Sequence, residues 1–564
     1  MNTNLHDPLN KLIRLQEERL DQFLDKRRTD LAEGREPDPL GLGVLTMTVP
    51  LYCQPDSKYY LDAGLDETMR ESLEQFMATQ LKSGCISLVN CNIDSPPDTA
   101  FMVHLVSLVY QVAQGSGLEQ IREIQNGLYT FMEKARPCLL NGGIHTPNHR
   151  WVMAGALAKM YEIFGDEAYK DRAFQFLDEG FDMTEYGEWT ERSNAIYNGA
   201  CAIHLYDVGV IFGYEPALEA IRKNLGMMQY MLHPDQSVAT EYSGRQDLGQ
   251  TMMMNDWYYV IYHLMASLDK DPVFLSMAQI TEETSPQGAS ALIHWMLYPE
   301  SMRLPDHVSV LSDSYTVLLG ENNEVPVPRN IPYLGKLVQH PHGASVLRHR
   351  RGKLSVTVMA GQPELLYIQY GKARMFGLKL AAGWFGIGAV AFPTIRQTGV
   401  DRYSMNIELE GCYFNPLPRE HTAGKNGIYV NMPNHLREKT NVQHLPVELD
   451  FQLLEDGLEV SVRSSAIPQI YLQAVCMFDP SGELSGDGLE EAAPHIKQLV
   501  HGDAVFSREG DCIRVSSGAK QHKDISMRNE KVNRDALNVT MNYVTPTDVT
   551  IRFQVYESEG GDRS

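Results

Sequence analysis

The hydrophobic pattern of this chain changes its period once, near residues 299–307. Before this point apolar residues recur at helical spacing, whereas after Pro305 they alternate with polar residues in short runs. The length of 564 residues also exceeds what a single hydrophobic core usually supports. We therefore expect two domains, a helical one over residues 1–304 and a β domain over residues 305–564.

The first half carries a long amphipathic helix, from Pro8 to about Leu31, and ten further helical patterns. These patterns cover residues 66–81, 99–113, 118–135, 150–164, 167–181, 194–212, 216–231, 250–268, 272–283 and 287–298. Residues 34–55 are interrupted by proline and glycine and are expected to cross the fold irregularly. Consecutive helices with short connections form antiparallel hairpins, and hairpins without a strict repeat motif predict an (α/α) toroid.

The second half contains twelve short alternating runs that predict strands. They cover residues 308–311, 315–319, 344–348, 354–360, 365–370, 405–410, 449–454, 458–463, 470–478, 513–516, 537–543 and 549–556. Glu455-Asp456-Gly457 is expected to form a hairpin turn between two of them. Because no helical pattern separates the strands, we expect an antiparallel β-sandwich, with long loops at residues 416–441 and 480–494.

A net charge of −23 argues against nucleic acids and anionic membranes as partners, because both require a basic face. The apolar runs are too short to span a membrane, and no apolar signal region precedes the first helix. We expect a cytoplasmic protein from the sequence as written, or a periplasmic or secreted one if a leader has been removed. The eight cysteines include no Cys-x-x-Cys pair, so we expect buried free thiols and neither a zinc ribbon nor a redox motif.

The first of three polar clusters, residues 142–151, leads into a helical pattern. Pro147 favours an extended residue before it and suits the first turn of a helix. Asn148 and His149 would then lie at a helix amino terminus, where free N–H groups and the helix dipole favour an anionic ligand. The alternative is that Asn148 only caps the helix and that His149 packs against Trp151.

The second cluster, residues 187–198, also opens a helical pattern. Ser193 is expected to cap this helix, with Tyr197 one turn further on the same face. Taken alone, Tyr197 is more often a core tyrosine, and Arg192 could equally be the ion-pair partner of a neighbouring glutamate. A third cluster, residues 240–247, precedes the next helix and adds Glu241, Tyr242, Arg245 and Asp247.

The motif Gly-x-Trp-x-Glu-x-Ser-x-x-x-Tyr of residues 187–197 follows Asn148-His149 by some forty residues. This order, within a helical toroid followed by a β-sandwich, resembles the heparinase II/III-like and alginate-lyase-like polysaccharide lyases. The resemblance implies that Asn148 holds the carboxylate of a uronic acid, that His149 is a base or a carboxylate partner, and that Tyr197 donates a proton. From their residue type, Arg192 and Arg245 are expected to assist electrostatically, and either could equally be a structural ion-pair partner of a neighbouring glutamate.

The three clusters and the second half are then expected to line one substrate groove. The candidate substrate-binding residues are His145, Trp151, Trp189, Glu191, Glu241, Tyr242, Arg245 and His342. His342 precedes a predicted strand, and a surface loop is its alternative. No cofactor is implied. The family's metal-binding pattern is not recognisable in the second half, which leaves a structural divalent metal there open.

β-Elimination explains these residue types. The C5 proton of a uronic acid can be removed only when the adjacent carboxylate is neutralised and the enolate is stabilised by preorganised donors. An amide, an imidazole or an arginine can do this without a metal, and a His or Tyr then moves the protons. The expected partner is a uronate-containing oligo- or polysaccharide, and assembly into a homo-oligomer is left open.

Two other functions fit the same sequence. An inverting glycoside hydrolase would use two carboxylates about 6.5–9.5 Å apart, drawn from Glu188, Glu191, Glu241 and Asp247. A non-catalytic glycan-binding protein would keep the architecture without the reaction, because a fold does not determine a function.

Overall fold

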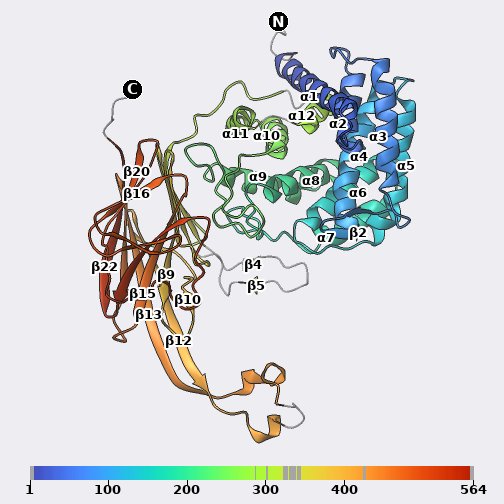
Figure 1. Cartoon of the computed structure of the whole chain (residues 1–564). Helices are drawn as coiled ribbons and strands as arrows, with labels where there is room; N and C mark the ends of the chain where they lie inside the picture. Colours follow the sequence, from blue (N-terminus) through green and yellow to red (C-terminus); the bar gives the residue numbers. More distant parts are fainter. Residues whose placement is uncertain are drawn as a thin grey trace. The chain divides into compact units, whose positions relative to one another are not determined.

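The computed structural model describes residues 6–285, 288–299, 303–321, 328–329, 338–339, 345–422 and 427–558. The chain forms two compact units (Figure 1). The first comprises residues 1–232, 236–312 and 328–338, and the second comprises residues 233–235, 313–327 and 339–564.

The first unit is a closed ring of helices, coloured blue to green in Figure 1. Within the described residues its inner helices are α2 (Leu42–Cys53), α4 (Pro96–Ser116), α6 (His149–Phe164), α8 (Tyr197–Phe212), α10 (Asp256–Asp269) and α12 (Ala289–Leu297). Each inner helix contacts the next, and α12 contacts α2, which closes the ring. The predicted (α/α) toroid is confirmed.

An outer helix packs on each inner one. The outer helices are α1 (His6–Ala32), α3 (Asp66–Ala78), α5 (Arg122–Asn141), α7 (Glu167–Leu177), α9 (Glu215–Met228) and α11 (Pro272–Thr284). Outer helices bury one face, as in α5, where Ile124, Leu128 and Phe131 follow the helical period. Inner helices are buried almost all round and use glycine at close crossings: a Cβ on Gly155 of α6 would lie 2.6 Å from the Cβ of His204 in α8.

Helix α2 was not predicted, because the prolines and glycines around residues 34–55 indicated an irregular crossing. Ten of its twelve residues are buried, and it contacts α1, α3, α4 and α12. Pro50 lies inside the helix, where it removes one backbone hydrogen bond. Burial of an entirely apolar segment therefore outweighs the local signal. The other predicted helices are confirmed, with ends shifted by a few residues.

The second unit contains two large sheets. One has the order β17-β18-β21-β15-β9-β8-β7-β6-β3, with β10 beside β9, and the other has the order β11-β12-β13-β14-β22-β20-β19-β16. Pairing is antiparallel throughout except between β18 and β21. One hydrophobic cluster draws residues from both sheets, among them Val356 and Leu378 from the first and Tyr403 and Leu449 from the second. The predicted antiparallel sandwich is confirmed.

The strands of the first sheet are β3 (Ser314–Leu319), β6 (Val346–Arg351), β7 (Leu354–Met359), β8 (Leu366–Tyr370), β9 (Ala373–Ala382), β10 (Gly388–Ala389), β15 (Tyr471–Phe478), β17 (Leu489–Ala493), β18 (Ile496–Leu499) and β21 (Leu537–Val544). Those of the second are β11 (Arg396–Gly399), β12 (Arg402–Phe414), β13 (Lys439–Leu454), β14 (Gly457–Ser464), β16 (Glu483–Ser485), β19 (Ala504–Arg508), β20 (Asp511–Val515) and β22 (Thr547–Glu557). Short pairs are formed by β1 (Ile86–Leu88) with β2 (Asn92–Ser95) and by β4 (Pro328–Arg329) with β5 (Val338–Gln339).

The strand predictions are wrong in several places, and β11, β18 and β19 were not predicted at all. Residues 308–311 form no strand, and Val310 in this segment is 98% exposed. The predicted loop at 480–494 contains all of β16 and β17. Strand β9 was missed because its sequence has no β-branched residue, yet it lies between β8 and β15 in the sheet. The remaining predicted strands and the hairpin turn at Glu455-Asp456-Gly457 are confirmed.

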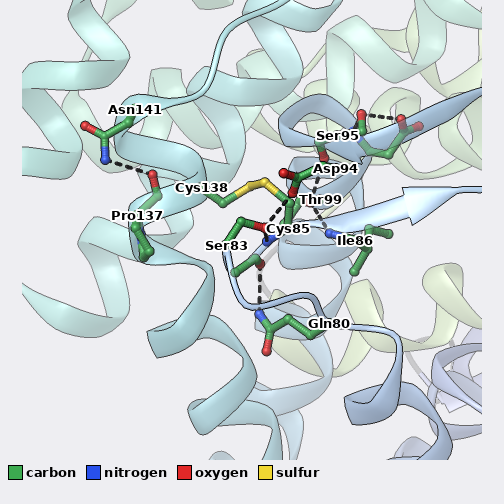
Figure 2. Close-up of a disulfide and its surroundings, with 12 residues drawn as sticks. Gln80, Ser83, Cys85, Ile86, Asp94, Ser95, Thr99, Pro137, Cys138 and Asn141 are labelled. Atoms are coloured by element: carbon green, nitrogen blue, oxygen red, sulfur yellow. Dashed lines mark hydrogen bonds between the residues drawn. A yellow bond between two sulfur atoms is a disulfide. The ribbon is translucent and has the colours of Figure 1, made fainter.

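The expectation of eight free thiols is also wrong, because Cys85 and Cys138 form a disulfide (Figure 2). The two cysteines are 53 residues apart, so no short spacing indicated their pairing. Gln80 Nε2 donates to the carbonyl oxygens of Gly84 and Phe131, both at 3.0 Å, which holds the loop before β1 against α5. Among the described residues, no helix combines the length and the hydropathy that a membrane span requires.

The disulfide generates the first prediction. Cys138→Ser should lower the unfolding free energy of the helical unit by about 2–5 kcal/mol, because the link restricts the unfolded chain. Thermal unfolding with and without dithiothreitol measures the effect. Cys91→Ser, at an exposed free cysteine, is the matched control and should leave the transition unchanged. Equal transitions for the Cys138 variant and the wild type would contradict the link.

Candidate active site

The three polar clusters precede α6, α8 and α10, which are consecutive inner helices. An outer helix returns the chain between each pair, so these inner helices run in the same direction and begin at the same end of the ring. The loops before them therefore lie on one rim.

Glu191 is the centre of the rim. Its side chain is 2% exposed and accepts three hydrogen bonds. Oε1 accepts from Asn148 Nδ2 at 3.0 Å and from Arg245 Nη1 at 2.7 Å, and Oε2 accepts from the Asn148 backbone N–H at 3.1 Å. One carboxylate thus joins the loops before α6, α8 and α10.

Burial raises the pKa of Glu191 to about 7, although the Arg245 charge and the Asn148 hydrogen bonds act in the opposite direction. The neighbouring carboxylate of Asp182 adds to the increase. Glu191 therefore takes up and releases a proton in the physiological pH range, whereas an ordinary glutamate is fully ionised there.

Asn148 uses its amide donors inside the protein. Nδ2 donates to Glu191 and, at 3.2 Å, to Thr146 Oγ1, and the side chain does not cap α6. Its Oδ1 is buried and has no hydrogen-bond partner among the described residues. With Glu191 ionised, Asn148 can therefore offer a ligand only an acceptor. Rotation of the amide would place Oδ1 beside Glu191, which requires a proton on that carboxyl group.

His149, the first residue of α6, is 6% exposed and lies edge-on to His145, with ring centroids 4.7 Å apart. Its Nδ1 is buried without a partner in the described part of the chain. Burial lowers the pKa of His149 to about 3, and the charges of His145 and Arg245 contribute to this decrease. Partial burial also lowers the pKa of His145, against the effect of Asp98. His149 is therefore neutral near pH 7.

Tyr197 begins α8 and is partly exposed. Its hydroxyl oxygen accepts a hydrogen bond from Gln246 Nε2 at 2.8 Å, and the Arg245 guanidinium lies 4.4 Å from the centre of its ring. Ser193 Oγ accepts the Tyr197 backbone N–H at 3.2 Å. Arg245 therefore contacts both Glu191 and Tyr197. It connects the Glu191–Asn148 contact with the predicted proton donor Tyr197.

Asp247 fixes the backbone beneath these side chains. It is fully buried and accepts from Ser193 Oγ at 3.0 Å, from Ser243 Oγ at 2.5 Å and from the Ala195 N–H at 3.2 Å. These bonds tie the loop before α8 to the loop before α10. All of them are internal, which gives Asp247 a structural role.

Arg192 and both tryptophans are held by contacts within the protein. Arg192 is 4% exposed, pairs with Glu188 at 3.1 Å, and lies over the Tyr242 ring at 4.3 Å. Trp151 is fully buried, and its ring is 5.6 Å from that of Trp189. These residues pack beneath the rim.

Of the sequence-predicted residues, the structure brings together His145, Asn148, His149, Glu191, Tyr197 and Arg245 through the contacts above. Arg192, Trp151, Trp189 and Tyr242 lie in the buried layer, and Glu241 is 8% exposed. His342 lies outside the described residues. Sequence reasoning did not single out Gln246 as a site residue, and its only signal was its position beside Arg245. Among the described residues, no group of three His, Cys, Asp or Glu side chains is arranged to hold a metal ion.

No family model matches the chain, and no curated protein matches it by sequence. Among solved structures, it is similar to the heparan sulfate lyase HepC from Pedobacter heparinus, with 11% identity, a TM-score of 0.47, and coverage of 92% of this chain and 76% of that one. For the chondroitin AC lyase of Streptomyces coelicolor A3 the values are 11%, 0.49, 98% and 83%. For an α-1,6-mannanase from Salegentibacter they are 15%, 0.28, 39% and 69%. The likeness to these structures is one of fold alone.

The raised pKa of Glu191 generates the second prediction. Between about pH 4.5 and 7 the folded protein keeps a proton on Glu191 that the unfolded chain has lost, so the unfolding free energy falls as the pH rises through this window. A shift of this size corresponds to about 3 kcal/mol. Relative to Glu191→Gln, which cannot ionise, the wild type should lose about this much stability from pH 4 to pH 8.

Chemical denaturation at several pH values measures the difference. Glu185→Gln, at an exposed glutamate of the same loop, is the control and should differ from the wild type by a constant amount. A constant difference for Glu191→Gln as well would show that folding does not shift the pKa of Glu191.

Proposed function

We propose that this protein is a polysaccharide lyase that cleaves a uronic-acid-containing glycan by β-elimination. The observation that carries the proposal is the position of Arg245. One guanidinium contacts both the Glu191–Asn148 pair and the Tyr197 ring. A uronate carboxylate bound at Arg245 would therefore have an imidazole, an amide and a phenol within the same rim, which are the groups that the elimination requires.

Arg245 is the proposed carboxylate-binding residue. Its charge would neutralise the uronate, which makes the C5 proton more acidic. In the free protein Arg245 is paired with Glu191 at 2.7 Å, so the substrate carboxylate must compete with that side chain. Two carboxylates beside one guanidinium repel each other, which favours a proton on Glu191. The protonated Glu191 would then donate to Asn148 Oδ1, and Asn148 Nδ2 would turn to the substrate carboxylate.

His149 is the proposed base. Neutral near pH 7, its imidazole has a free lone pair to accept the C5 proton. A pKa of about 3 makes it a weak base in the empty site. The negative charge of a bound uronate would raise this value, so its basicity would increase when the substrate is present.

Tyr197 is the proposed acid. The C5 proton leaves to His149, the C4–C5 double bond forms, the C4–O bond breaks, and the leaving oxygen takes the proton of the Tyr197 hydroxyl. Arg245 on the ring face and the Gln246 amide at 2.8 Å would stabilise the charge that develops on the phenolic oxygen. His149 would then return its proton through solvent, which restores both residues.

The other predicted functions have less support. Of the four carboxylates available to an inverting hydrolase, Glu188, Glu191 and Asp247 are engaged in internal bonds. A hydrolase needs two carboxylates that face a water molecule and the sugar. The Cys85–Cys138 disulfide supports an oxidising compartment, so we favour a periplasmic or secreted protein over a cytoplasmic one.

The third prediction tests the reaction. Incubation with a panel of uronate oligosaccharides should raise the ultraviolet absorbance of a conjugated 4,5-double bond for at least one of them. Tyr197→Phe should lower kcat by about 100-fold or more, because proton transfer contributes about 10²–10⁴-fold. Tyr214→Phe, at the start of α9, is the matched control. Cleavage products without a double bond would overturn the proposal in favour of hydrolysis.

The fourth prediction concerns pH. Because uronate binding requires Glu191 to release Arg245, KM should rise about tenfold per pH unit above the pKa of Glu191, which is about 7. Glu191→Gln has no proton to lose, and its KM should be flat from pH 7 to 9. Initial rates over this range measure both. A wild-type KM that is equally flat would contradict the competition between Glu191 and the substrate.

A further inference from the structure

The second unit contains a cavity of about 420 Å³ that takes no part in the proposed reaction. It is lined by residues of β3 and β6 in the first sheet and by the β11–β12 turn and the end of β13 in the second sheet. We call it the sandwich-edge cavity, and its lining residues are Ser314, Tyr315, Thr316, His349, Arg351, Asp401, Leu453, Leu454 and Glu455. Its volume lies within the usual range of small-molecule sites, about 300–1,000 Å³.

The cavity is a polar continuation of the sandwich core. In β6 the core residue Leu347 is followed at two-residue intervals by His349 and Arg351, which share its face of the sheet. Their partners in β3 are Thr316 and Ser314, so apolar pairs give way to polar pairs along the same face.

The opposite sheet contributes polar residues from its turns. Asp401 lies in the β11–β12 turn, two residues before the core residue Tyr403, and Glu455 lies in the β13–β14 turn, two residues after the core residue Leu453. Polar side chains from both sheets therefore line this end of the core. A polar-lined space of this kind supports a ligand or ordered water.

His349 has an unfilled hydrogen-bonding position. It is 8% exposed, its Nδ1 lies 2.8 Å from Thr316 Oγ1, and its Nε2 is buried without a partner among the described residues. Burial lowers the pKa of His349, so the ring is neutral and Nε2 is a donor or an acceptor according to the tautomer. A hydroxyl group can complement either tautomer, whereas an anion or an ammonium can complement only one.

The charges of the cavity favour the same class of ligand. Asp401 and Glu455 outnumber Arg351, which lies 3.8 Å from Glu455, so the lining has no surplus of positive charge to hold a uronate or sulfate. An ammonium has only donors, so it cannot accept a hydrogen bond from the guanidinium of Arg351. The cavity therefore favours a ligand whose groups both donate and accept hydrogen bonds and which has an apolar face to contact Leu453. A neutral sugar has both features, in its hydroxyls and its ring C–H groups.

We propose that the sandwich-edge cavity binds a neutral sugar unit of a glycan and is a second glycan site, separate from the candidate active site. The choice of a glycan as ligand rests on the proposed function. Asp401 accepts from vicinal hydroxyls, His349 Nε2 bonds a third hydroxyl, and Leu453 contacts the C–H face. The site would hold a neutral segment of a polymer whose uronate units are cleaved elsewhere.

Isothermal titration of the full chain with neutral hexasaccharides of glucose, galactose, mannose and xylose tests the proposal. At least one should bind, and Asp401→Asn and His349→Leu should each weaken it about tenfold, the effect of losing one hydrogen bond to a charged or buried group. Asp548→Asn, at an exposed carboxylate of β22, is the matched control. If His349→Leu lowers the melting temperature, its weaker binding could reflect unfolding. The Asp401→Asn variant, at an exposed residue, then tests the site without this complication.

Tyr197→Phe should leave this binding unchanged, which separates the second site from the proposed reaction. A failed ultraviolet assay with intact hexasaccharide binding would refute the lyase alone. The second site would be overturned if none of the hexasaccharides bound, if the Asp401 and His349 variants bound like the wild type, or if only a uronate hexasaccharide or spermidine bound.

Discussion

Glu191 is a carboxylate with almost no access to water, and an uncompensated charge in such a place costs several kcal/mol. The compensation comes from Arg245 and from two N–H groups of Asn148. Arg245 belongs to the loop before α10, whereas Asn148 belongs to the loop before α6. Desolvation still exceeds this compensation, since the pKa is raised and not lowered. The same contact therefore joins the loops and, under the proposed function, would be exchanged for a substrate carboxylate. The Glu191–Arg245 ion pair thus both stabilises the rim and controls whether a ligand can bind to Arg245.

The ring supplies the conditions for that contact. Inner helices that all begin at one end bring three loops together, and residues without side chains at the crossings, such as Gly155, allow the helices to approach closely. Asp247 then fixes the loop backbones through three internal bonds. The reactive groups proposed here thus lie on a scaffold held by internal bonds, and among the described residues the buried atoms without a hydrogen-bond partner include Asn148 Oδ1 and His149 Nδ1.

Much of this fold was predictable from the sequence, because amphipathic period is a local property. The failures occur where tertiary contacts decide. Helix α2 is apolar on all sides and has no period to detect, and β9 has a helical composition but pairs with strands on both sides. The Cys85–Cys138 link depends on two segments that meet only after folding. Sequence reasoning identified the polar loops of the site but could not separate Arg245, which links Glu191 to Tyr197, from Arg192, which is buried beside Glu188.

Arg192 has a positive φ of 55°, a conformation that costs a residue with a Cβ atom about 1 kcal/mol or more. Glycine would relieve the backbone there but would leave the buried charge of Glu188 unopposed, whereas lysine would keep a charge without the flat contact on the Tyr242 ring. The backbone and the side-chain environment thus make incompatible demands on this position. Substitutions at residue 192 should consequently be tolerated only when residue 188 also changes, so the two positions would evolve together.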